Sequence, residues 1–263
     1  MTMASYDRPA AFRIGRVFGD TFSVLGRNFG LCIGLAAIFS GIPSFLYQLW
    51  TQGQVEATLA AAEGGVPPQF DPSSIGTGLG AFLIYMVLAS ILQSALVRAT
   101  IEDLNGKQPT FSDSISRAIS VLLPIIGLSI LVYLGLMIGF MLLVIPGIYL
   151  LLRWSVAIPV LVQERRGVLD SMSRSATLTK GNRWRILGLI VIFYIALIVL
   201  QLAVTLVVGV AATLTGGLIG AVLFALVSAL STILISIAVA VTYVELRYVK
   251  EGADVRELAE IFA

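Results

Sequence analysis

The stretch that decides the fold is Val144–Gly188, with the sequence VIPGIYLLLRWSVAIPVLVQERRGVLDSMSRSATLTKGNRWRILG. It contains Arg153, the one charged residue inside an apolar segment of this chain. The pair Pro146-Gly147 predicts a turn that ends one apolar helix and reverses the chain, because proline interrupts helices and glycine permits turns. Residues 148–163 then predict a short membrane span that contains a second proline. A basic loop and an amphipathic helix over Val168–Lys180 follow, so the stretch joins two hydrophobic hairpins.

The composition indicates a membrane protein. The chain has 263 residues, of which 58% are hydrophobic and 12% are charged, with a mean hydropathy of +0.97. Soluble domains carry roughly a quarter charged residues. Several apolar runs approach about 20 residues, the length of a membrane-spanning helix. Because these runs are continuously apolar rather than alternating, we predict an all-α, polytopic transmembrane helical bundle and not a β-barrel.

We predict one integral membrane domain over residues 1–263, with both termini in the cytoplasm of a bacterial cell and the bundle in its inner membrane. Basic residues number four in the N-terminal arm, three in the loop 98–120, six in the loop 164–185 and three in the tail, but none in the loops 51–75 and 210–217. Basic loops remain on the cytoplasmic side. The first 28 residues lack a signal-peptide pattern, so we expect no cleavage there. The predicted parts are a cytoplasmic arm with an interfacial helix (1–28), a bundle of six spans (29–243) and a cytoplasmic tail (244–263).

The six predicted spans leave one alternative open. The fourth is short and imperfect, and as a re-entrant segment it would leave only five crossings. The spans cover residues 29–50, 76–97, 121–145, 148–163, 186–209 and 218–243.

A repeated pattern predicts a pseudo-threefold arrangement of hairpins. A short amphipathic segment precedes each pair of spans, and we expect these segments to lie in the membrane interface. The second and third segments share an apolar-x-Asp-Ser-apolar-Ser-Arg pattern, over Phe111–Arg117 and Val168–Arg174. The segment over residues 12–28 is more divergent.

Small residues predict where helices pack closely, because lipid supplies no hydrophobic drive between helices and association depends on close contact. Gly30 with Gly34, and Gly135 with Gly139, form two GxxxG pairs. The sixth span carries a stripe of small residues that we expect to face the bundle interior. This stripe comprises Gly217, Ala221, Ala225, Ala229, Thr232, Ser236 and Ala240.

The sequence argues against an enzyme. Histidine is absent, which excludes histidine-based metal sites and Ser-His-Asp triads. The spans lack a carboxylate near mid-membrane, and the chain has no phosphate-binding glycine loop. We therefore predict no catalytic residues, no metal site, no cofactor and no nucleic-acid partner.

Arg153 is the residue that most needs an explanation, because an arginine inside the membrane costs at least about 2–3 kcal/mol. Its side chain either extends to the interface or bonds backbone carbonyls freed by the prolines. Alternatively, it binds an anion such as a lipid phosphate, with two parallel hydrogen bonds. The basic loops beside it primarily fix topology and could also hold anionic headgroups. The candidate anion or lipid contacts are Arg153, Trp154, Arg165, Arg166, Arg183 and Arg185.

Residues 144–188 resemble the membrane domain of bacterial glycerophosphoryl diester phosphodiesterases and related inner-membrane proteins of the YciC type. The N-terminal arm is also similar. The resemblance implies that catalysis in the enzyme members belongs to a separate soluble barrel with essential histidines and metal-binding carboxylates. Since this sequence has no histidine, that activity is not carried over to it. The matching features are Pro146-Gly147, Arg153, Pro159, Glu164, Val168–Ser175, the Leu178–Gly181 segment and Trp184.

Three functions remain open. The leading one is a non-enzymatic membrane protein that binds membrane lipid, including anionic phospholipid, or a protein partner, which includes a second copy of the chain. The alternatives are a small transporter or channel for an anionic or amphiphilic solute, and an accessory membrane subunit of a separate enzyme. A polar cavity reaching Arg153 would favour transport, whereas a closed bundle with Arg153 bonded to carbonyls would favour a structural role.

Overall fold

The computed structural model describes residues 12–47, 73–215 and 218–251 and four single positions between 50 and 58. Within these ranges all regular secondary structure is helical. Six helical segments are long and apolar enough to cross a membrane, which confirms the predicted fold class. The last of them ends at Glu251. Most of the predicted loop 51–75 and the end of the predicted tail lie outside the described residues. The six segments are Phe29–Tyr47, Gly76–Leu104, Leu122–Leu142, Val144–Glu164, Arg183–Leu206 and Ala225–Glu251.

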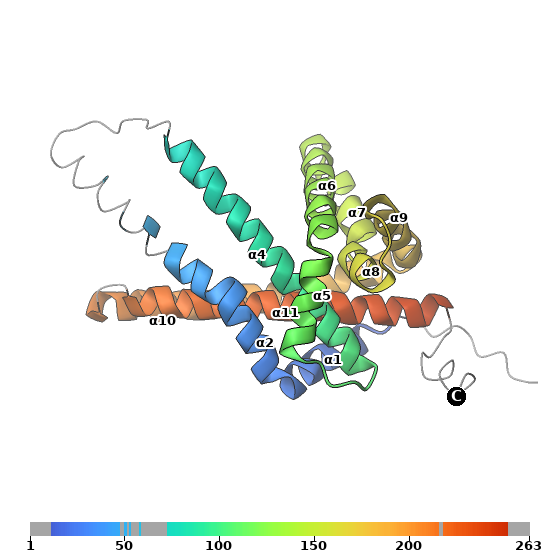
Figure 1. Cartoon of the computed structure of the whole chain (residues 1–263), viewed down its shortest axis with the longest axis horizontal. Coiled ribbons are helices and arrows are strands. Elements are labelled where there is room, and N and C mark those ends of the chain that lie inside the picture. Colours follow the sequence, from blue (N-terminus) through green and yellow to red (C-terminus); the bar gives the residue numbers. More distant parts are fainter. Residues whose placement is uncertain are drawn as a thin grey trace, which may run out of the picture.

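The long helices form three hairpins that diverge from a shared base (Figure 1). In the figure, the hairpins containing α4, α6 and α10 point in different directions, and their near ends meet around α5 and α11. A threefold relation between the hairpins stays a prediction. The first hairpin is α2 (Phe29–Ala36), the π-helical turn η1 (Ala37–Gly41) and α4 (Ser73–Leu104); the second is α6 (Leu122–Leu142), α7 (Val144–Trp154) and α8 (Ala157–Glu164); the third is α10 (Arg183–Thr215) and α11 (Leu218–Glu251).

A short helix precedes each hairpin, as the repeated pattern predicts. These helices are α1 (Ile14–Arg27), α5 (Phe111–Ser120) and α9 (Val168–Thr179). The Thr110 hydroxyl caps α5 by accepting a hydrogen bond from the Asp113 amide at 3.3 Å. The α9 helix packs against α6, α7, α8 and α11. We call the region formed by these short helices and the last turns of α11 the base.

Prolines mark the breaks between helices, but not where the sequence analysis placed them. Pro124, Pro146 and Pro159 are each the third residue of a helix, α6, α7 and α8 respectively. The predicted Pro146-Gly147 turn is therefore wrong: the chain reverses at Leu143, whose backbone is extended, and Pro146 lies in the first turn of α7. Proline fits there because the first amide groups of a helix have no intrahelical acceptor.

The fourth span is broken into two helices but continues over Val144–Glu164. The break lies at Ser155–Val156, just before the first turn of α8. The combined length favours six spans over the alternative of five. This span is therefore long enough to cross, despite its proline.

Two spans extend further than predicted. The α4 helix continues beyond Val97 to Leu104, through the start of the predicted loop 98–120. Arg98 and Glu102 form an ion pair of 2.6 Å one turn apart on it, and such pairs stabilise a helix as it leaves the hydrocarbon. Likewise α11 continues past Tyr243 to Glu251. On both helices, charged residues therefore begin before the helix ends.

The α11 helix lies at the centre of the bundle. In its most apolar window 56% of the residues are buried, against 17% for the spans in α6 and α10. Of the predicted small-residue stripe, Ala225, Ala229, Ser236 and Ala240 are buried, and Thr232 is half-buried with its hydroxyl bonded to the Ser228 carbonyl. Gly217 and the side chain of Ala221 lie outside the described part. That the stripe drives helix association stays a prediction.

The two GxxxG pairs differ in their surroundings. A Cβ atom on Gly135 would lie 2.5 Å from the Trp154 ring, and one on Gly139 would lie 3.1 Å from the Gly147 Cα, so α6 and α7 approach closely there. A Cβ atom on Gly30 would meet no atom within 4 Å, and one on Gly34 would make only ordinary contact with Phe111. The second pair is therefore a close helix contact, and the first is not.

This difference gives a stability prediction. Gly135→Ala places a methyl group against the Trp154 ring, which must move out of its packed position. We expect a loss of about 1–3 kcal/mol in the free energy of unfolding, the usual effect of overpacking. Gly30→Ala is the matched control and should leave stability unchanged or slightly raised, since alanine favours helix. Thermal unfolding in detergent measures both, and equal midpoints would contradict the proposed contact.

Candidate anion and lipid site

The structure separates the six candidate residues into different groups. The Arg166 side chain is paired with Glu164 at 2.7 Å, and Arg185 donates to the Phe12 carbonyl at 3.1 Å. Both guanidinium groups therefore serve contacts within the protein. Arg165 is exposed at the end of α8, with a left-handed backbone. Trp154 packs its ring over Gly135.

Arg153 and Arg183 remain, and Tyr149 connects them. The Arg183 guanidinium lies 4.5 Å from the centre of the Tyr149 ring, a cation–π distance. Tyr149 and Arg153 lie one helical turn apart on α7, so they share a face. Both arginines are half-buried. Tyr149 therefore contacts the Arg183 guanidinium and shares its face of α7 with Arg153.

These two guanidinium groups are poorly satisfied by the protein. In both arginines the Nε atom is buried without a hydrogen-bond partner among the described residues. The Arg153 backbone carbonyl accepts from the Ser175 hydroxyl at 3.0 Å, but its guanidinium forms no ion pair or hydrogen bond with another described residue. The expected bonds from Arg153 to freed carbonyls are therefore not found in this part of the chain. Buried N–H donors of this kind need an acceptor.

An apolar cavity of about 310 Å³ lies between α6, α7, α10 and α11. Arg183 precedes its first α10 residue, Ile186, by three positions, on the same face of the helix. Arg153 does not line the cavity, because Leu151, Trp154 and Ser155 present the opposite face of α7 to it. The remaining lining residues are Val132, Leu136, Leu189, Ile190, Phe193, Tyr194, Leu197, Ile235, Ala238, Val239 and Thr242.

A second cavity, of about 910 Å³, lies between α4 and the end of the first span. Its lining includes Pro43, Tyr47, Phe82 and Tyr85, together with Ser228 of α11, and none of its described lining residues is charged. Neither of these two cavities is a polar passage that reaches Arg153. The observation expected of a transporter is therefore not met by either of them.

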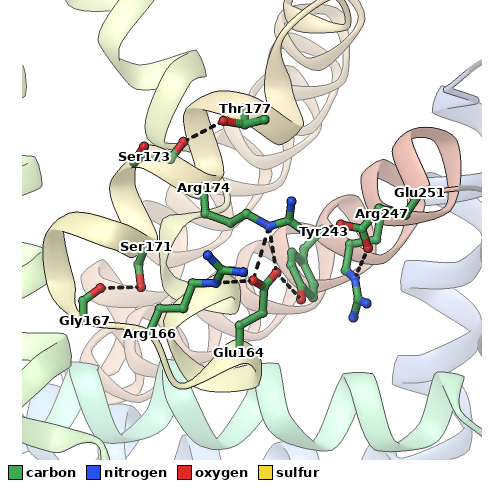
Figure 2. A network of polar contacts seen from close by, with 10 residues as sticks. All are labelled: Glu164, Arg166, Gly167, Ser171, Ser173, Arg174, Thr177, Tyr243, Arg247 and Glu251. Atoms are coloured by element: carbon green, nitrogen blue, oxygen red, sulfur yellow. Dashed lines mark hydrogen bonds and ion pairs between the residues drawn. The ribbon is translucent and has the colours of Figure 1, made fainter.

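Sequence reasoning missed a polar network at the base, centred on Glu164 (Figure 2). Both Glu164 carboxylate oxygens accept from the Arg174 Nε at 3.2 Å, and one accepts from the buried Tyr243 hydroxyl at 3.1 Å. Arg174 also pairs with Glu251, which accepts from Arg247 at 2.9 Å. Burial tends to lower the pKa of Arg174, but its bonds to Glu251 and Glu164 outweigh burial and raise the pKa above its usual value. The network joins α8, α9 and α11.

Other buried carboxylates connect further elements of the base. Asp103 of α4 accepts from Arg27 at 3.2 Å and from the Asn28 amide group at 2.8 Å. Glu245 of α11, only 5% exposed, accepts from the Arg13 backbone amide at 3.1 Å and pairs with Arg16 at 3.4 Å. These carboxylates are engaged in helix contacts. Among the described residues, no group of three or more potential metal-ligating side chains comes together.

The fold and this site define a multi-pass helical membrane protein whose arginines divide between internal ion pairs and an unpaired pair, with an apolar cavity among its helices. Residues 125–255, about half of the chain, match the family model described as the membrane domain of glycerophosphoryl diester phosphodiesterase. The resemblance seen in the sequence is therefore confirmed for this region, which includes Arg153, Arg183 and the Glu164 network. The matched family is a membrane domain and not a catalytic domain. Neither the curated proteins nor the solved structures contain a match.

The Glu164 network predicts a graded loss of stability. Tyr243→Phe removes one buried hydrogen bond to Glu164 and should lower the free energy of unfolding by about 1 kcal/mol. Glu164→Ala leaves both Arg174 and Tyr243 without this acceptor and should cost about 2–4 kcal/mol. Lys180→Gln, at an exposed position, is the control for loss of a charge. Chemical unfolding in detergent is the measurement, and a Glu164→Ala variant as stable as the control would refute the role of this network.

Proposed function

We propose that this chain is a non-enzymatic membrane protein that binds the headgroup of an anionic lipid through Arg153 and Arg183. The observation that carries the proposal is that both half-buried arginines have a buried Nε atom with no partner in the described protein, while Arg183 stacks on Tyr149, which shares a face of α7 with Arg153. A lipid phosphate supplies the missing acceptor and the missing countercharge. Arg166 and Arg185 are not part of the proposed site, because each already has a partner within the chain.

Physical chemistry favours phosphate over a neutral ligand. A guanidinium group removed from water is costly unless it is paired and hydrogen-bonded. Its flat array of N–H donors matches phosphate oxygens with two parallel bonds, whereas a lysine would present a single point charge. Arg183 is also held in place by its stacking on Tyr149, so less conformational freedom is lost when an anion binds.

An accessory role for a separate enzyme is the second candidate. It is supported by the description of the matched family, whose membrane domain belongs to a glycerophosphoryl diester phosphodiesterase. Anionic lipid binding and enzyme recruitment are compatible, because an enzyme can contact a different surface of the chain from the one that holds the lipid. Chemical cross-linking in the native membrane to a phosphodiesterase on another chain would favour this role. Transport lacks the support that a polar cavity at Arg153 would give, because neither of the two cavities is a polar passage to that residue.

We propose that the protein lies in a bacterial inner membrane with its base and both termini in the cytoplasm. Apart from Arg153, the basic residues of the described part lie in the short helices, at helix ends or in the loops that join them. A phosphatase reporter that is active only in the periplasm, fused after Ala263, should therefore be inactive, and a fusion within the loop 51–75 should be active. The reverse pattern would overturn the orientation.

The lipid proposal predicts a loss of bound lipid without a loss of fold. Arg153→Leu and Arg183→Gln each remove donors to the phosphate, and we expect each to lower copurified anionic phospholipid by about tenfold, as for loss of a charged hydrogen bond. Arg153→Lys should also lose lipid, because it lacks the bidentate geometry. Arg165→Gln is the control, since Arg165 is exposed and lies outside the site. Quantitative lipid mass spectrometry makes the comparison, and variants that keep the lipid complement of the unmodified protein would refute the proposal.

A further inference from the structure

We propose that the ligand is a single anionic phospholipid, held by its phosphate at Arg183 and by one acyl chain in the cavity between α6, α7, α10 and α11. This inference rests on the proposed function and adds to it the second half of the binding site. It assigns the cavity of about 310 Å³ to a hydrocarbon chain.

The order of groups along α10 matches the order of groups in a phospholipid. The cavity follows this helix from Ile186 to Leu197, eleven steps along the helix, which is about 16 Å at 1.5 Å per residue. Arg183 lies one turn before Ile186, and helical side chains lean toward the helix N-terminus. The guanidinium therefore lies beyond the end of the cavity, next to Tyr149, with the apolar lining leading away from it. A charged headgroup followed by an extended chain has this same arrangement.

The polar groups in the cavity wall do not favour a hydrophilic solute. The Thr242 hydroxyl donates to the Ala238 carbonyl at 2.7 Å, and the Ser155 hydroxyl donates to the Leu152 carbonyl at 3.0 Å. Both hydroxyl protons are thus used within their own helices. Most of the other lining is aliphatic or aromatic, including Phe193, which packs on Phe18 with ring centres 5.1 Å apart. A mostly apolar wall of this kind suits a hydrocarbon chain better than a hydrophilic solute.

The proposal distinguishes a phospholipid from a free phosphate or a phosphate ester without a chain. Each of these could bind Arg183, but only the phospholipid uses the cavity. Binding should then depend on both the charge of the headgroup and the presence and length of the chain.

The test uses a variant that fills the cavity. Ala238 is 7% exposed and lines the cavity, so Ala238→Phe places a ring in the space of the chain. Ala196→Phe is the matched control, because Ala196 is exposed on α10 and does not line the cavity. A second variant, Leu197→Phe, shortens only the far end. The full chain in detergent is titrated with phosphatidylglycerol of short and long chain length, with inorganic phosphate and glycerol phosphate as competitors, and bound lipid is read by native mass spectrometry.

We expect Ala238→Phe to bind phosphatidylglycerol about tenfold more weakly while Ala196→Phe binds normally, and neither competitor to displace the lipid at equal concentration. Leu197→Phe should shift the preference severalfold toward the lipid with the short chain. This second variant keeps the proposal testable even if Ala238→Phe fails to fold. If the arginine variants lose lipid while Ala238→Phe and Leu197→Phe bind both chain lengths normally, the cavity assignment is wrong and the headgroup proposal survives. If the arginine variants also bind normally, both are wrong. Displacement by inorganic phosphate or glycerol phosphate would identify a phosphate site without a chain and would also overturn the inference.

Discussion

The Glu164 carboxylate accepts hydrogen bonds from Arg174 and Tyr243, and the arrangement of the other hairpins depends on this contact between α8, α9 and α11. A buried carboxylate with several donors is directional, and it loses most of its stabilisation when one helix shifts. Asp103 likewise connects α4 to Asn28 at the end of α1, and Glu245 connects α11 to Arg13 at the start of α1. Away from the base, the hairpins diverge where such contacts are absent among the described residues (Figure 1).

The fold could be predicted to the extent that local sequence encodes it. Hydropathy over about 20 residues identifies the six spans, and amphipathic spacing identifies α1, α5 and α9. Helix boundaries were less accurate, since proline indicates that a break is near without giving its position. Pro146 lies inside the first turn of α7, three residues after the reversal at Leu143. Similarly, the predicted second span ends just before the charged Arg98, although the α4 helix continues to Leu104.

For the candidate site, the sequence could predict a set of candidate residues but not their arrangement. Sequence identified the basic residues, but which of them are free depends on partners far away in the chain. Arg185 bonds to a carbonyl 173 positions away, and Arg16 pairs with a carboxylate 229 positions away. Arg166 is different, because its partner Glu164 is two residues earlier, and that pair could have been proposed from the sequence. The cavity could not, because four helices contribute to its wall.

The distribution of charge among the described residues distinguishes Arg153 and Arg183 from the arginines that form ion pairs. The described carboxylates of Glu102, Asp103, Glu164, Glu245 and Glu251 are each engaged by arginines of the base. None of the described carboxylates pairs with Arg153 or Arg183, so their charge is not balanced within that part of the chain, although both side chains are half-buried. The proposed lipid site rests on this difference: Arg183 and Arg153 lie where α7 meets α10, and the apolar cavity follows α10 from there.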